Sequence, residues 1–191
     1  MSEGDPYVYL DARNVLKNKF GIKDRDQLRM VERVHVVQRI EEGPPKGNFD
    51  LAHLKVIRKH LFQDVYEWAG QTRTVEMTKG EDHFQPVAYI ETGMADIHRR
   101  LEQRRFLEGL KGEDFAREAA KIIGDINYVH PFREGNGRTQ LQYLKQLAER
   151  AGHDIDLARL QPDQWLDASR AAHMTNYEPM RQAIAGALLD G

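Results

Sequence analysis

Apolar residues recur at every third or fourth position along nearly the whole chain of 191 residues. That spacing places them on one face of an α-helix. It predicts helices over about 24–40, 51–68, 90–106, 115–130, 138–152, 163–172 and 177–189. No internal repeat, low-complexity tract or long linker interrupts the pattern. We therefore expect an all-α fold, a compact bundle of about seven or eight helices that forms one domain over residues 1–191.

One stretch, residues 72–89, departs from the helical period. Thr74, Val75, Met77 and Thr78 favour a strand, residues 79–82 are typical of a turn, and apolar residues follow. The sequence therefore predicts one β-hairpin over about 73–86.

Composition removes several classes of function. The chain has no cysteine, which excludes disulfides, Cys-ligated zinc, Fe–S clusters and a cysteine nucleophile. The 28 Lys and Arg residues against 30 Asp and Glu residues leave no basic surplus for nucleic acid or an anionic membrane. No run of about 18 apolar residues predicts a membrane span. The polar first residues do not resemble a signal peptide, so we expect a cytoplasmic protein, although a chain without cysteine also suits export.

The segment that carries chemistry is HPFREGNGR, residues 130–138, between two predicted helices. His130 follows Ile126 by four residues, which aims its imidazole inward, and a neutral imidazole is suited to accept a proton. Glu134 is a hard oxygen ligand of the kind that Mg²⁺ takes. The Gly-Asn-Gly stretch 135–137 can point successive N–H groups into one anion-binding nest, and Arg138 can grip a phosphate beside it. Together these residues indicate a nucleotide-phosphate site with a proton acceptor.

Each feature alone has a simpler interpretation. A Gly-Asn-Gly stretch is often only a turn, and Glu134 and Arg138 can form an ordinary surface pair at i,i+4. It is the conjunction within nine residues that favours a catalytic site.

The same residues resemble the signature of the Fic family, His-x-Phe-x-(Asp/Glu)-Gly-Asn-Gly-Arg-x-x-Arg, which lies between two helices of an all-α core. Residues 130–138 match it in register, and residues 5–7, 16–18 and 62–70 are also similar to short bacterial Fic toxins. The resemblance implies a protein adenylyltransferase that transfers AMP from ATP, with Mg²⁺, to a Tyr, Thr or Ser hydroxyl of a target protein.

The resemblance also implies a role for each motif residue. His130 would deprotonate the target hydroxyl, and Glu134 would hold Mg²⁺ on the α- and β-phosphates. Gly135, Asn136 and Gly137 would form the anion hole, with Asn136 on the α-phosphate and Arg138 on the β-phosphate. Phe132 would anchor the loop in the core. The hairpin resembles the family's flap, which would dock the target by strand addition through a set of five residues: Thr74, Val75, Glu76, Met77 and Phe84.

The chain departs from the signature at Leu141, where the family has its second arginine. Two hypotheses follow. Either ATP is placed less well or the donor is a different nucleotide, and the family's inhibitory glutamate would lack its arginine partner. Two alternatives to adenylyl transfer therefore remain open: a phosphotransferase or other nucleotidyltransferase with altered nucleotide placement, and a silent Fic-fold binding module.

Regulation and location follow from the same resemblance. The family's inhibitory motif is Ser/Thr-x-x-x-Glu-Gly/Asn. Residues 42–43 and 108–109 have its Glu-Gly ending, but Gln38 and Arg104 stand at the Ser/Thr positions, so the motif is absent. Control would then come from a separate small antitoxin that carries the inhibitory glutamate helix, docked for example on the helix over 24–40. The protein would act in the bacterial cytoplasm, or in a host cell if it belongs to a secreted effector. Asn127, Ser169 and Asn176 are candidates for the adenine pocket.

Overall fold

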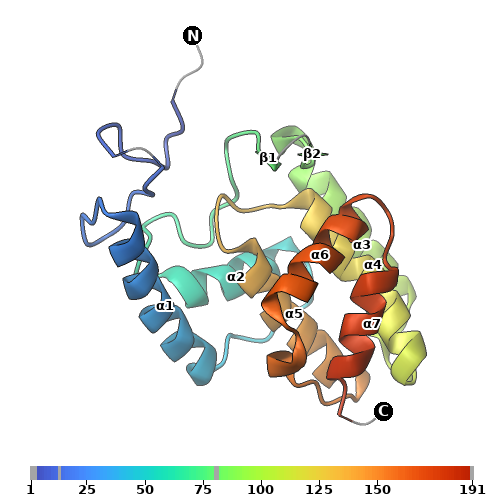
Figure 1. Cartoon of the computed structure of the whole chain (residues 1–191). Coiled ribbons are helices and arrows are strands. Elements are labelled where there is room, and N and C mark those ends of the chain that lie inside the picture. Colours follow the sequence, from blue (N-terminus) through green and yellow to red (C-terminus); the bar gives the residue numbers. More distant parts are fainter. Residues whose placement is uncertain (1–3, 13, 80–81, 190–191) are drawn as a thin grey trace.

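The computed structural model describes residues 4–12, 14–79 and 82–189. In these residues it has seven α-helices and one short antiparallel hairpin, which confirms the expected fold class (Figure 1). The helices are α1 (Arg25–Glu42), α2 (Leu51–Phe62), α3 (Ile90–Gln103), α4 (Gly112–Val129), α5 (Asn136–Ala151), α6 (Pro162–His173) and α7 (Glu178–Ala187). The strands are β1 (Thr78–Lys79) and β2 (Asp82–His83), and three short 3-10 turns are η1 (Val87–Tyr89), η2 (Arg105–Leu107) and η3 (Leu157–Arg159).

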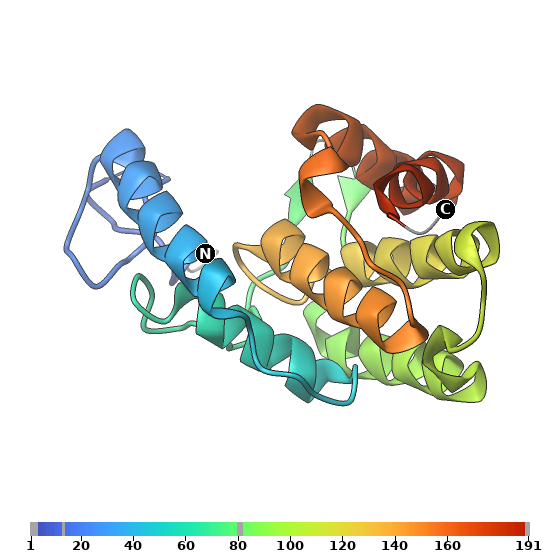
Figure 2. The ribbon, with the colours of Figure 1, turned by 90° about the horizontal axis from the view of Figure 1, so that it is seen from below.

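Helix α4 forms the centre of the core. It packs against α3, α5, α6 and α7, while α1 lies outside on α2 (Figures 1 and 2). Its buried side is small and aliphatic, and residues such as Ala119, Ile123 and Ile126 are fully inaccessible to solvent. Because α4 is held on several sides, the loop that follows it starts from a fixed point.

Helix α2 ends at Phe62, so the predicted continuation to Trp68 is wrong. The chain turns instead, because Tyr66 and Trp68 stack on each other with ring centroids 4.4 Å apart, and Arg58 binds the Trp68 carbonyl. Gly70 allows this turn: its φ is +81°, and a Cβ there would lie 2.9 Å from the carbonyl oxygen of Lys55.

The hairpin is shorter than the sequence predicts. Thr78 pairs with His83, whereas Thr74, Val75 and Met77 lie outside the strands. Residues 80–81, in the predicted turn, lie outside the described residues. One further hydrogen bond, from the Phe84 N–H to the Met77 carbonyl, extends the ladder. Residues 73–76 do not continue it, and the Val75 carbonyl accepts instead from the buried Arg73 side chain.

Two other boundaries differ from expectation. Helix α5 begins at Asn136, two residues before Arg138, because Gly135 adopts the left-handed conformation that ends the loop. Helix α3 stops at Gln103, and Phe106 follows in a 3-10 turn with φ +54°. Helix α2 is capped at its start by the Asp50 carboxylate, which accepts a hydrogen bond from the His53 N–H.

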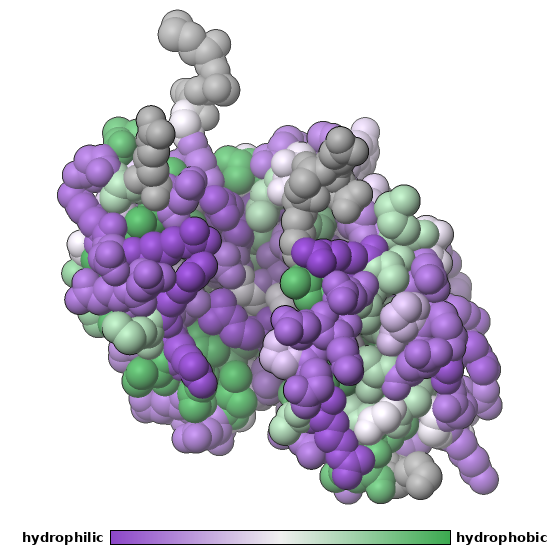
Figure 3. All heavy atoms as spheres, viewed as in Figure 1, coloured by the Kyte–Doolittle hydropathy of each residue, from purple (hydrophilic) through white to green (hydrophobic). Residues whose placement is uncertain are grey.

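Most of the surface in Figure 3 is hydrophilic, and it is hollowed between the part that carries α1 and the part that carries α6. In the described residues, no helix has both the length and the apolar character that crossing a membrane requires.

Candidate active site

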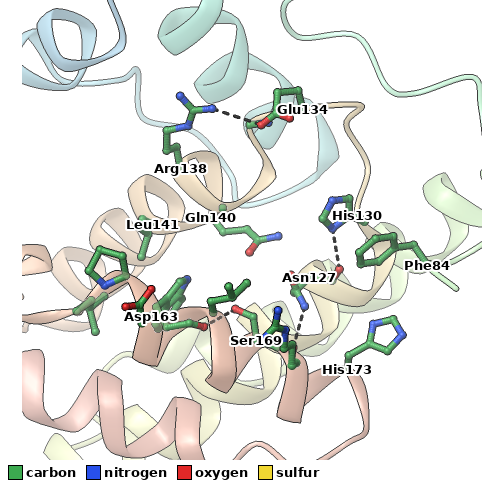
Figure 4. Close-up of a pocket in the computed structure, with 17 residues that line it drawn as sticks. Phe84, Asn127, His130, Glu134, Arg138, Gln140, Leu141, Asp163, Ser169 and His173 are labelled. Carbon is green, nitrogen blue, oxygen red and sulfur yellow. Dashed lines mark hydrogen bonds and ion pairs between the residues drawn. The ribbon is translucent and has the colours of Figure 1, made fainter. Parts of the chain in front are cut away.

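A cavity of about 520 Å³ opens beside the motif. The motif loop and the start of α5 form one wall, and α6 faces them across the cavity (Figure 4). The end of α4 supplies Asn127, and the segment after β2 supplies Phe84. The cavity therefore brings together residues from four separate parts of the chain, and its volume suits a ligand of nucleotide size.

His130 is the first residue beyond α4, where it takes a left-handed conformation with φ +47°. Its N–H still bonds to the Ile126 carbonyl, and the turn directs the side chain to the cavity. Nδ1 lies 3.2 Å from the carbonyl oxygen of Asn127. Because a carbonyl only accepts, this contact places the proton on Nδ1, which leaves Nε2 as the basic nitrogen.

The Phe84 ring stacks on the His130 imidazole, with centroids 3.8 Å apart and planes at 19°. On its other side Phe84 meets the His173 ring edge-on at 5.5 Å. The sequence predicts Phe84 as a docking residue of the flap. The structure places its ring against the candidate base, where it limits how the imidazole can turn.

Glu134 lies at the mouth of the cavity, and its side chain is 42% exposed. Its Oε1 accepts from the Gly135 N–H at 2.9 Å, and Arg138 approaches the same oxygen at 3.4 Å. The described residues contain no cluster of three His, Cys, Asp or Glu side chains that would form a protein-only metal site. A single accessible carboxylate at the cavity mouth does fit Mg²⁺, which commonly binds one or two carboxylates plus substrate phosphates.

Gly135 is required by its surroundings. Its φ is +82°, and a Cβ there would collide with the Phe62 ring. By contrast, a Cβ on Gly137 would meet no atom within 4 Å among the described residues. The two motif glycines therefore differ: Gly135 is needed for the fold of the loop, whereas Gly137 leaves open space at the start of α5.

Asn136 faces the loop rather than the cavity. Its Oδ1 accepts from the Phe132 N–H at 3.0 Å, and its Nδ2 donates to the Phe132 carbonyl at 2.6 Å. Phe132 itself is 1% exposed, so this pair fastens the middle of the loop to the core. The Asn136 side chain is thus engaged with the Phe132 backbone, while its backbone N–H lies in the first turn of α5, where N–H groups are open to an anion.

Arg138 makes a contact that the sequence does not indicate. Its NH1 donates to Oε1 of Glu32, on α1, at 2.6 Å, and its guanidinium lies over the Phe62 ring. Glu32 is buried and also accepts from the Tyr66 hydroxyl. Only the three-dimensional packing of α1 brings Glu32 and Arg138, 106 positions apart, together.

A second residue that sequence reasoning missed is Arg58. It is fully buried, and its Nε donates to the Glu134 carbonyl at 2.9 Å. Burial lowers its pKa to about 10. The sequence did hold a signal for Arg58, because it stands among the apolar residues of its helix. A cation buried at such a position needs a specific set of acceptors.

The rest of the cavity is mixed in character. Leu141 lines it, as do Asn127 and Ser169, whereas Asn176 is not among its lining residues. Asn127 Nδ2 donates to the Ser169 carbonyl at 3.1 Å. Two lining residues, Gln140 and Trp165, have buried nitrogen donors without a hydrogen-bond partner in the described part of the chain. Gln140 points across the cavity in Figure 4.

The remaining flap residues lie beside a smaller cavity of about 350 Å³, lined by Val75, Glu76 and Met77. Thr74 lies next to it in sequence, and its hydroxyl is 3.3 Å from the Tyr7 hydroxyl. The Glu76 carboxylate accepts from the Val87 N–H at 3.1 Å, so it closes the base of the flap.

Comparison with known proteins gives a consistent result. Residues 48–148 match the model of the Fic/DOC family. The chain is 38% identical over 181 residues to a protein of Sinorhizobium fredii named "Probable protein adenylyltransferase y4lH", covering 94% of each. It is 38% identical to protein adenylyltransferase VbhT of Bartonella schoenbuchensis, over 94% of this chain but only 38% of VbhT. The structure is similar to that of the Bartonella tribocorum effector BepC with bound AMPPNP, with TM-score 0.87, 29% identity and 97% of each chain covered.

Proposed function

The chain belongs to the Fic/DOC family, and from that premise we propose that it is a protein adenylyltransferase that transfers AMP from ATP to a hydroxyl side chain of a target protein. The observation that carries the proposal is the His130 imidazole at the cavity wall, with its Nδ1 held by the Asn127 carbonyl. Relatives named adenylyltransferases and a similar structure with bound AMPPNP support it.

His130 acts as the general base. Its Nε2 takes the proton of the target hydroxyl while the hydroxyl oxygen attacks the α-phosphorus of ATP. The new oxygen–phosphorus bond forms as the bond from the α-phosphorus to the bridging oxygen breaks, and pyrophosphate leaves. The Asn127 carbonyl stabilises the resulting imidazolium through its hydrogen bond to Nδ1.

The start of α5 holds the phosphates. The N–H groups of Gly135, Asn136 and Gly137 lie at the positive end of the helix, which favours an anion there. The phosphate replaces the Glu134 carboxylate as the acceptor of the Gly135 N–H, and Arg138 adds a charge-assisted hydrogen bond. Glu134 would hold the Mg²⁺ that accompanies ATP, which when bound neutralises phosphate charge.

The nucleoside occupies the end of the cavity near α6. There the unpartnered donors of Gln140 and Trp165 meet acceptor atoms of the base or ribose, with Asn127 and Ser169 close by. The target segment docks on the flap, residues 73–86, where a backbone can pair regardless of its side chains.

The whole chain, residues 1–191, acts as one domain with two kinds of protein partner: the target, and a separate small antitoxin. The antitoxin is supported by the sequence, which lacks the full inhibitory pattern Ser/Thr-x-x-x-Glu-Gly/Asn. The site of action is the bacterial cytoplasm, or a host cell if the protein is translocated as the similar Bartonella tribocorum effector is.

Mass spectrometry of cell lysate incubated with the protein, ATP and Mg²⁺ tests the proposal, with His130→Ala as the control. We expect AMP on a Ser, Thr or Tyr residue of at least one protein, absent from the control. Transfer of phosphate instead would favour the phosphotransferase alternative, and no modification would favour the binding module.

A further inference from the structure

Arg73 lies at the base of the flap and is among the most buried side chains of the protein, at 1% exposure. The nearest carboxylate is that of Glu76, 3.6 Å away and largely exposed. Burial lowers the pKa of Arg73, because the charged guanidinium is removed from water. A buried cation whose one carboxylate partner is largely exposed to solvent needs other partners.

The partners are backbone carbonyls on two separate elements. On the catalytic side, Nε donates to the His130 carbonyl at 2.8 Å and NH2 to the Val129 carbonyl at 3.3 Å. On the flap side, NH1 donates to the Val75 carbonyl at 2.9 Å and NH2 to the Gln85 carbonyl. One planar group thus joins both sides of the flap to the end of α4.

Backbone hydrogen bonds reinforce the same junction. The Arg73 N–H donates to the Pro131 carbonyl at 2.8 Å, and the Gln85 N–H donates to the Tyr128 carbonyl at 3.1 Å. Arg73 also places a positive charge at the C-terminal end of α4, where helix carbonyls are unpaired. The left-handed conformation of His130 is therefore held from outside the loop, by the segment that begins the flap.

We propose that Arg73 is a positioning residue for the transfer reaction: its guanidinium joins the target-docking flap and the His130 backbone into one rigid unit. This inference rests on the proposed function. A target backbone that pairs with the flap is then set at a fixed distance from Nε2 of His130. A displacement of the reacting groups by about 1 Å can lower the rate about a hundredfold. A rigid link between the flap and His130 therefore contributes directly to the rate of transfer.

The chain offers a matched comparison in Arg58, which is equally buried but binds the Glu134 carbonyl, on the nucleotide side of the loop. Lysine keeps the charge at either position but lacks the planar fork that bridges several carbonyls. Arg73→Lys should therefore impair the acceptor step, and Arg58→Lys should impair nucleotide placement.

The activity test follows the transfer of labelled α-phosphate from ATP to lysate proteins over a series of ATP concentrations, with His130→Ala as background. Arg73→Lys should lower the maximum rate at least about tenfold and leave the apparent KM for ATP within about twofold. Arg58→Lys should mainly raise that KM. Either of two results would overturn the proposal. The maximum rate of Arg73→Lys could stay within about twofold of the wild type, or its KM for ATP could rise by the same factor as the maximum rate falls.

Amide hydrogen exchange of the unmodified protein tests the link without any activity and without a variant that must fold. The amides of Arg73, Gln85 and His130 should be protected to within about tenfold of one another, because the unit opens together. Exchange at Gln85 more than about a hundredfold faster than at His130 would overturn the proposal. If the wild type labels no protein, the proposed function fails while the exchange result still decides whether the flap and the base form one unit.

Discussion

The Arg138 guanidinium donates to the Glu32 carboxylate across 2.6 Å, which ties the first turn of α5 to the middle of α1. Glu32 is 9% exposed and also receives the Tyr66 hydroxyl, so removal of either partner leaves a buried polar group unsatisfied. The arginine expected to bind a phosphate is thus also part of the protein's structural framework.

A double-mutant cycle of Glu32→Ala and Arg138→Ala should therefore give a coupling free energy of about 1–3 kcal/mol in urea unfolding. The exposed pair Arg170 and Asp167, on α6, is the matched control and should give about 0.5 kcal/mol or less. Equal coupling in the two pairs would contradict a structural role for Glu32.

The two motif glycines should respond differently to alanine. Gly135→Ala should destabilise the protein by about 1–3 kcal/mol and abolish activity, because the new Cβ meets the Phe62 ring at a positive φ. Gly137→Ala should leave the free energy of unfolding unchanged or raise it by up to about 1 kcal/mol, since it lies in open space at the start of a helix. Urea unfolding measures both changes, and equal destabilisation would contradict this account of the loop.

Leu141→Arg should tighten ATP binding about tenfold, because it adds one charge-assisted hydrogen bond to a cavity wall that is now apolar. Calorimetric titration with ATP and with adenosine measures the effect, and Leu141→Met controls for changed packing. The gain should be absent for adenosine, which has no phosphate. An equal gain for adenosine would place residue 141 away from the phosphates.

Phe84→Ala should lower kcat and leave the KM for ATP nearly unchanged, because the His130 imidazole loses the ring stacked on it. Phe84→Tyr keeps the stacked ring and should retain most of the activity. Steady-state labelling rates over a range of ATP concentrations measure both parameters. Loss of activity in Phe84→Tyr equal to that in Phe84→Ala would assign Phe84 a role other than stacking.

The protein should lose stability at alkaline pH because of Tyr177. Burial, together with the hydrogen bond to Asp125 at 2.6 Å, raises its pKa to about 12. The folded state therefore keeps this proton above pH 10, where the unfolded chain releases it, so stability falls as pH rises from about 10 to about 12. Thermal unfolding at pH 8 and pH 11 should show a smaller loss for Tyr177→Phe than for the wild type. An identical loss would contradict the assignment.

The sequence was sufficient for the helices and for the local motif. Apolar spacing predicted each α-helix that the described residues form, and the motif brought His130, Glu134 and Arg138 within nine residues of one another. These features depend on neighbours in the chain. The Fic resemblance, confirmed by the family match, supplied the activity that the local chemistry alone left open.

The errors arose where distant segments compete with local preference. Helix α2 stops at Phe62 because Trp68 packs on Tyr66, and the hairpin is short where the Arg73 side chain binds the Val75 carbonyl. Glu32 is an unremarkable residue of an amphipathic helix until α1 is packed beside Arg138. Such long-range pairs leave no period or motif in a single sequence.

The central claim is that His130 promotes attack on the α-phosphorus of ATP. The most direct measurement compares protein labelling from ATP that carries radiolabel in the α-phosphate with labelling from ATP that carries it in the γ-phosphate. The account predicts that label enters protein from the α-position only, with release of pyrophosphate, and that His130→Ala abolishes it. Label entering protein from the γ-position, or α-label that persists in His130→Ala, would contradict it.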